Sequence, residues 1–107
     1  MMDRLMDDAD LARAIVAVFL ENTPRQIAAL RGALAAGDRP HAVCQAHSIK
    51  GSSANLGGKA LQAVAFDIEE AAKAGELDSA MRRLAELEAQ FDQLQVAMRK
   101  ELGLTAG

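Results

Sequence analysis

The chain has 107 residues, of which 50% are hydrophobic and 25% are charged, and it carries one cysteine and a formal net charge of −3. This length and composition indicate a single globular domain over residues 1–107 and exclude both a disordered chain and an internal disulfide. The acidic balance disfavours a nucleic-acid partner, and the lack of a signal peptide or of a roughly 20-residue apolar run predicts a cytoplasmic domain without direct membrane contact.

Apolar residues at helical spacing predict a first long helix that is capped by Asp10 and ends at Ala36, with an optional short helix before it at residues 3–8. The apolar stripe of the long helix is expected to begin with Leu11, Ile15, Val18 and Phe19. Proline lacks a backbone donor and disfavours helical geometry in the residue before it. We therefore expect a kink or a short break at Thr23-Pro24.

Glycines and one proline mark the borders of the next helices. Asp38 is the expected cap of a second helix from Arg39 to about Leu56, with Pro40 in its first turn and Gly57-Gly58 after it. A third helix is predicted from its apolar stripe of Leu61, Val64, Ala65, Ile68 and Ala72, and Gly75 closes it. The last helix begins at Glu76 or Asp78 and carries the seam Met81, Leu84, Leu87, Phe91, Leu94, Met98 and Leu102. Because the connections are short, the sequence predicts an all-α, up-down-up-down antiparallel four-helix bundle.

The segment from Ala42 to Leu56 reads AVCQAHSIKGSSANL and contains the candidate site. At about 100° per residue, its core flank comprises Ala42, Val43, Ala46, Ile49, Ser53 and Leu56. His47 lies well over about 100° from the centre of that flank, so it should meet solvent. Its neighbours along the helix are small or apolar except for one lysine: Val43, Cys44, Lys50, Gly51 and Ala54. A glycine within a helix costs about 1 kcal/mol relative to alanine, so Gly51 indicates close approach by another molecule.

These residue types suit phosphoryl chemistry. Neutral imidazole is a good nucleophile, and its Nε2 can attack a phosphorus atom and hold the group as a phosphoramidate. The ammonium group of Lys50, one turn after His47, can offset the charge of the phosphoryl oxygens. The hydroxyl groups of Ser48, Ser52 and Ser53 could orient the imidazole ring or bond the helix backbone.

The run His47-Ser-Ile-Lys50-Gly51-Ser-Ser-Ala-Asn-Leu-Gly57 resembles the signature of histidine phosphotransfer domains of hybrid sensor kinases and phosphorelays. Other segments resemble the same family: Phe19-Leu-Glu-Asn-Thr-Pro-Arg-Gln-Ile, the Gly37-Asp38 turn, and Ile68-Glu69 before Gly75. The resemblance implies that His47 is the phosphorylated residue, that Lys50 assists, and that Gly51 makes room for a receiver domain. Ala65 departs from the family, since many relatives carry a cysteine there, but it is expected to be a core position.

The resemblance also implies the partners. A response-regulator receiver would present a phospho-aspartate to His47, and a second receiver would take the group onward. Receiver docking is expected at Val43, Cys44, Ser48, Gly51, Ala54 and Phe66. The chain has no nucleotide-binding motif, so we expect a carrier without an ATP site or cofactor of its own, and Mg²⁺ supplied by the receiver. We expect the domain to be a monomer. It is expected to be either the excised C-terminal module of a larger kinase, which can be membrane-bound, or a free-standing protein.

Two other functions fit parts of the sequence: a helical adaptor that binds a partner without phosphotransfer, and the phosphoacceptor module of a chemotaxis-type kinase. A zinc site at His41, Cys44 and His47 is disfavoured, because this spacing turns His41 about 240° away from His47. The acidic pair Glu69-Glu70 and the charges from Arg82 to Glu88 are expected to be solvated.

Overall fold

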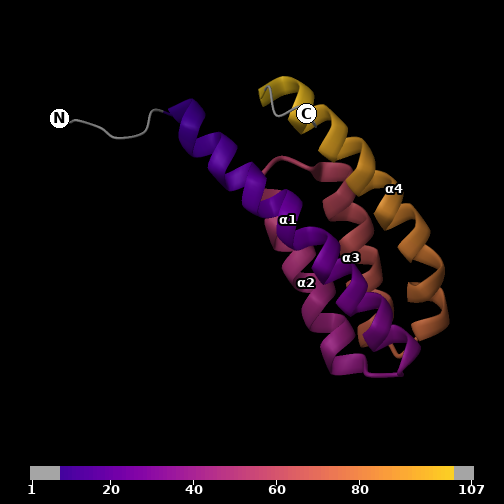
Figure 1. Cartoon of the computed structure of the whole chain (residues 1–107). Coiled ribbons are helices and arrows are strands. Elements are labelled where there is room, and N and C mark those ends of the chain that lie inside the picture. The colour runs from indigo at the N-terminus through magenta and orange to yellow at the C-terminus, as the bar shows by residue number, and fades with distance from the viewer. Residues whose placement is uncertain (1–7, 103–107) are drawn as a thin grey trace.

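The computed structural model describes residues 8–102, and within them it has four helices: α1 (Asp8–Ala35), α2 (Arg39–Asn55), α3 (Lys59–Lys73) and α4 (Leu77–Leu102). Each helix packs against the next along the chain, and α1 also packs against α4, so the bundle closes (Figure 1). The predicted all-α four-helix bundle is confirmed. The optional short helix was placed on residues 3–8, of which residues 3–7 lie outside the described range.

Turns built from glycine set the two ends of α2. Gly37 and Gly57 have φ values of 71° and 72°, in the left-handed region that favours glycine. At the start of α2, a side-chain oxygen of Asp38 accepts a hydrogen bond from the backbone N–H of His41 at 3.3 Å. The predicted borders of α2 are therefore confirmed to within one residue.

The expected feature at Thr23-Pro24 is a kink or a short break. The break does not occur, because α1 runs through Pro24 without interruption, and the kink stays a prediction. Proline removes one intrahelical hydrogen bond, but packing opposes a break. Buried residues lie on both sides of it, including Leu20, Thr23 and Ile27. The predicted N-cap at Asp10 is also wrong, since Asp10 lies inside the helix.

The predicted apolar stripe of α1 is wrong at three of its four positions. Leu11, Ile15 and Val18 are 51%, 48% and 55% exposed, whereas Phe19 is buried. The buried side of this part of α1 begins at Val16 and continues through Phe19 and Leu20. Leu11, Ile15 and Val18 lie on a neighbouring side of the helix, which the bundle leaves uncovered.

All four helices contribute to the core: α1 adds buried apolar residues between Val16 and Leu34, and the predicted stripes of α2, α3 and α4 supply most of the rest. All five predicted stripe residues of α3 are buried, and the seam of α4 is buried at Leu84, Leu87, Phe91 and Met98. Four buried alanines, Ala42, Ala46, Ala65 and Ala72, are fully inaccessible in α2 and α3. Small residues let helix axes approach closely, and the α2–α3 contact is the most extensive in the bundle. No helix within residues 8–102 has the length and apolar character to cross a membrane.

Candidate functional site

His47 lies in the middle of α2 with its side chain 66% exposed, as its place on the helical wheel predicts. The adjacent Ala46 and the nearby Ile49 are fully buried against the core. These two residues fix the rotation of α2, so the imidazole emerges on the outer side of the helix.

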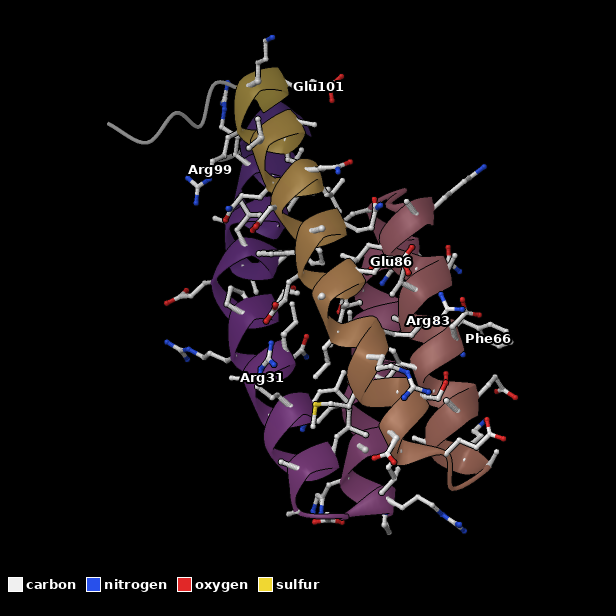
Figure 2. The ribbon with its side chains drawn as sticks, turned by 90° about the vertical axis from the view of Figure 1, so that its right-hand side faces the viewer. Arg31, Phe66, Arg83, Glu86, Arg99 and Glu101 are labelled. Carbon is white, nitrogen blue, oxygen red and sulfur yellow. The ribbon has the colours of Figure 1, made fainter. Side chains whose placement is uncertain are left out.

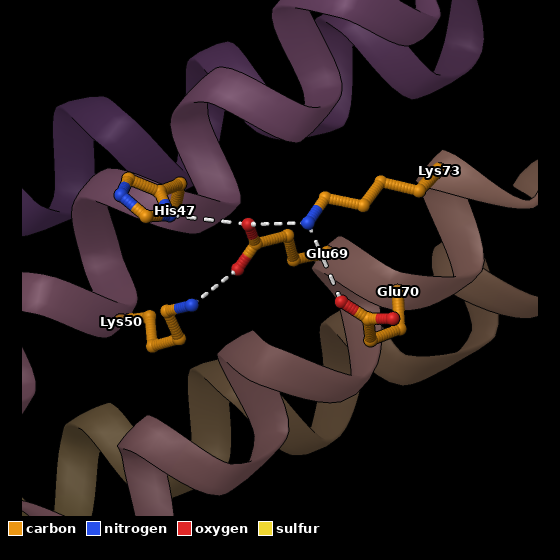
Figure 3. A network of polar contacts seen from close by, with 5 residues as sticks. All are labelled: His47, Lys50, Glu69, Glu70 and Lys73. Atoms are coloured by element: carbon orange, nitrogen blue, oxygen red, sulfur yellow. Dashed lines mark hydrogen bonds and ion pairs between the residues drawn. The ribbon is translucent and has the colours of Figure 1, made fainter.

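Glu69 of α3 reaches the imidazole from the neighbouring helix. His47 Nδ1 lies 3.1 Å from Glu69 Oε2, and Lys50 Nζ lies 2.8 Å from Glu69 Oε1 (Figure 3). A second ammonium group, Lys73 Nζ, lies 3.4 Å from Glu69 Oε2. Glu69 itself is only 3% exposed. We refer to His47, Lys50, Glu69 and Lys73 as the Glu69 cluster.

The prediction that Glu69 is solvated is wrong, although Glu70 beside it is 52% exposed. Glu69 follows the buried Ile68 and lies one turn from the buried Ala65 and Ala72. It therefore stands at the edge of the core stripe of α3, on the side that faces α2. One signal was available in the sequence: an acidic residue beside a core stripe, on the helix that follows a histidine and a lysine.

The Glu69 carboxyl is held in its ionised form by its partners. Burial alone would raise its pKa, but hydrogen bonds from Lys50, His47 and Lys73 outweigh burial and hold the pKa below its ordinary value. An ionised carboxylate only accepts hydrogen bonds, so the proton of this contact belongs to His47 Nδ1. In a neutral imidazole, this tautomer leaves the lone pair on Nε2, which is the nitrogen that a nucleophilic reaction requires.

The Glu69 cluster predicts an acid-sensitive contribution to stability. The Glu69 carboxyl has a lower pKa in the folded chain than in the unfolded chain, where the ordinary value is about 4.3. Such a group stabilises the fold fully at pH values above about 4.3. This stabilisation is lost as the pH falls from there through the lower pKa of the folded chain. The difference in unfolding free energy between wild type and Glu69→Gln should therefore shrink below about pH 4.3. Urea unfolding of both proteins at pH 7 and at pH 3 measures this difference in unfolding free energy. An equal difference at the two pH values would contradict a stabilising role for the ionised Glu69 carboxyl.

Lys50 contacts both Glu69 and Phe66. Its side chain is 25% exposed, and Nζ lies 5.4 Å from the centroid of the Phe66 ring, within the range of a cation–π contact. Phe66 is 47% exposed and lies on the outer side of α3 (Figure 2). The structure therefore brings together Lys50 and Phe66, which the sequence placed on different helices.

Along α2, the residues beside His47 are small or apolar except for Lys50. Cys44, Gly51 and Ala54 are exposed, whereas Val43 and Ser48 are half-buried. A Cβ atom built on Gly51 meets no atom within 4 Å, so no contact inside the bundle requires glycine there.

The serines after His47 bond their own helix. Ser52 Oγ donates to the Ser48 carbonyl at 3.0 Å, and Ser53 Oγ donates to the Ile49 carbonyl at 2.6 Å. These two hydroxyls therefore satisfy the backbone, which is one of the two roles that the sequence allowed, and neither bond is to the imidazole.

Exposed residues of α1 extend this surface on the side away from Glu69. Ile15 and Val18 of α1 line a shallow groove together with Ser52, Asn55 and Leu56 of α2. The sequence placed Ile15 and Val18 in the core, so it missed this part of the surface. Within residues 8–102, no three side chains of His, Cys, Asp or Glu gather as potential metal ligands. His41 instead bonds Asp38, with Nδ1 2.5 Å from Oδ2.

Among models of known protein families, one matches this chain. The family model described as the Hpt domain matches residues 14–97, which include all of α2 and α3 and the whole Glu69 cluster. The search of curated proteins finds no match. No solved structure matches the chain either.

Proposed function

Because the chain belongs to the Hpt domain family of histidine phosphotransfer modules, which act in phosphorelays with receiver domains, we propose that His47 is its phosphoacceptor. In this proposal, His47 takes a phosphoryl group from a receiver phospho-aspartate and passes it to the aspartate of another receiver. The observation that carries the proposal is the contact from His47 Nδ1 to Glu69, which leaves the Nε2 lone pair on an exposed side chain.

In this step, the phosphoryl group moves to His47 and no proton has to leave the domain. The Nε2 lone pair of His47 forms a bond to phosphorus, the acyl O–P bond breaks, and the aspartate leaves as a carboxylate. Lys50 lies one turn from His47, and its ammonium group offsets the charge of the phosphoryl oxygens. The chain acts as a carrier with no cofactor of its own, and the receiver supplies Mg²⁺ and most of the electrostatic stabilisation.

The receiver docks on the surface around His47. Gly51, Cys44 and Ala54 let the partner approach the backbone of α2, and Phe66 borders this surface on α3. Ile15 and Val18 add an apolar area on α1, next to the groove that they share with α2. Exposed apolar area beside a reactive group is typical of a protein–protein contact.

The proposal is tested by incubating the purified domain with a phosphorylated receiver and Mg²⁺. The expected result is an acid-labile, base-stable label on the domain, as a phosphoramidate requires. A lack of label with a broad panel of receivers, on a domain that circular dichroism shows to be folded, would favour a non-phosphorylated adaptor.

Replacing Lys50 with methionine should slow phosphoryl transfer by about 10- to 100-fold without unfolding the domain. Methionine keeps the length of the side chain but removes the charge, while the second ammonium group of the cluster, on Lys73, stays in place. Single-turnover transfer from a phosphorylated receiver measures the effect. Lys59→Met, at an exposed position at the start of α3, is the matched control and should transfer at the wild-type rate. Equal rates for the two variants would remove Lys50 from the mechanism.

A further inference from the structure

The contact between Glu69 and His47 has a consequence for the phosphorylated domain. Once Nε2 carries the phosphoryl group, a ring that still carries the Nδ1 proton bears a positive charge. Glu69 Oε2 lies 3.1 Å from this nitrogen, and the carboxylate is nearly inaccessible to solvent. A buried negative charge at this distance stabilises the positively charged ring much more than it stabilises a neutral ring.

We propose that Glu69 retains the proton on His47 Nδ1 after phosphorylation and thereby keeps the phosphoryl group ready to leave. This inference rests on His47 as the phosphoacceptor. In the onward step, the aspartate of the second receiver forms an O–P bond, the N–P bond breaks, and its electron pair returns to Nε2. With the proton on Nδ1, the leaving group is a neutral imidazole; without that proton, it would be an imidazolate anion, which is a far poorer leaving group.

The charges around Glu69 keep it available for this role. Lys50 contacts one carboxylate oxygen and Lys73 the other, so Glu69 stays negative despite its burial. Lys73 is shared with Glu70, 3.5 Å away on the outer side of α3. On α1, the other helix that packs on α2, Glu21 and Arg25 pair with each other at 3.7 Å.

A purely structural role for Glu69 makes a different prediction. If Glu69 served only to join α2 to α3, its loss would lower stability and would leave the proton equilibrium of the phosphorylated ring unchanged. Glu69→Gln separates the two roles, because glutamine keeps the size of the side chain and an accepting oxygen but removes the charge. Glu70→Gln is the matched control, since it removes the same charge from the next residue, which is exposed.

The experiment is an NMR titration of the full chain labelled with ¹⁵N-histidine and phosphorylated by potassium phosphoramidate. We expect phosphorylated Glu69→Gln to lose the Nδ1 proton at a pH lower than wild type by about one unit or more, as the loss of one close charge implies. Onward transfer to a receiver should fall with increasing pH at the same two midpoints. Glu70→Gln should titrate as wild type does.

Two results would overturn the inference: the same midpoint for wild type and Glu69→Gln, or an equal shift in Glu70→Gln. Failure of the proposed function would look different. In that case, phosphohistidine would form with phosphoramidate, but no receiver would remove the group from any of the three proteins. The titration itself needs no receiver, so it still tests Glu69 separately.

Discussion

Replacing His47 with glutamine is expected to reduce phosphoryl acceptance from a receiver by at least about 1000-fold, to below detection, because the attacking nitrogen is removed. The fold should persist, because the side chain is 66% exposed and points away from the core. The stability cost should be about 1 kcal/mol, the typical value of one hydrogen bond, here the bond to Glu69. Lys50 and Lys73 continue to pair with the buried carboxylate.

Labelling with a phosphorylated receiver, next to thermal unfolding of the same samples, measures both effects. His41→Gln is the matched control: His41 is also on α2, is 74% exposed, and bonds Asp38 rather than Glu69. It should accept label as wild type does. Label that persists in His47→Gln and disappears in His41→Gln would move the phosphoacceptor to His41. Global unfolding of His47→Gln would show that the residue has a structural role that its exposure does not suggest.

Replacing Gly51 with glutamate should weaken receiver binding and lower transfer by about 100-fold or more at a fixed receiver concentration, which corresponds to about 2.7 kcal/mol. The new side chain would project from α2 one turn after His47, into the space that we propose for the receiver. The domain itself should become slightly more stable, because glutamate is a better helix former than glycine and its Cβ meets no atom within 4 Å.

Two further variants make the Gly51 result specific. Gly32→Glu places the same substitution at another exposed helical glycine with open space, on α1, and should transfer as wild type does. Gly51→Ala should raise stability by up to about 1 kcal/mol and reduce binding less than glutamate does. Receiver titration by calorimetry and single-turnover transfer provide the data. Wild-type binding in Gly51→Glu would place the docking surface elsewhere.

The sequence predicted most successfully where local chemistry decides the structure. Gly37, Asp38 and Gly57 set the borders of α2, and the apolar residues between them, such as Ala46 and Ile49, indicated which side of the helix faces the core. The core stripe of α3 was predicted in full, because five apolar residues at helical spacing admit only one buried side.

Prediction failed where tertiary packing overrides local preference. Pro24 disfavours a helix locally, but the buried residues around it keep α1 continuous. Ile15 and Val18 are as apolar as core residues, and only the placement of the other helices leaves them exposed. Glu69 was missed for a related reason: its burial depends on Lys50 and His47, which reach it from another helix.

The alanines of α2 and α3 also affect the entropy of the site. Alanine has no rotamers to lose on folding, so Ala42, Ala46, Ala65 and Ala72 allow the two helices to associate without a side-chain entropy cost at these positions. The backbones that carry His47 and Glu69 are joined by the most extensive helix–helix contact of the bundle. A receiver that docks here does not have to spend binding energy on ordering these two helices, so more of that energy is left for aligning its phospho-aspartate with Nε2.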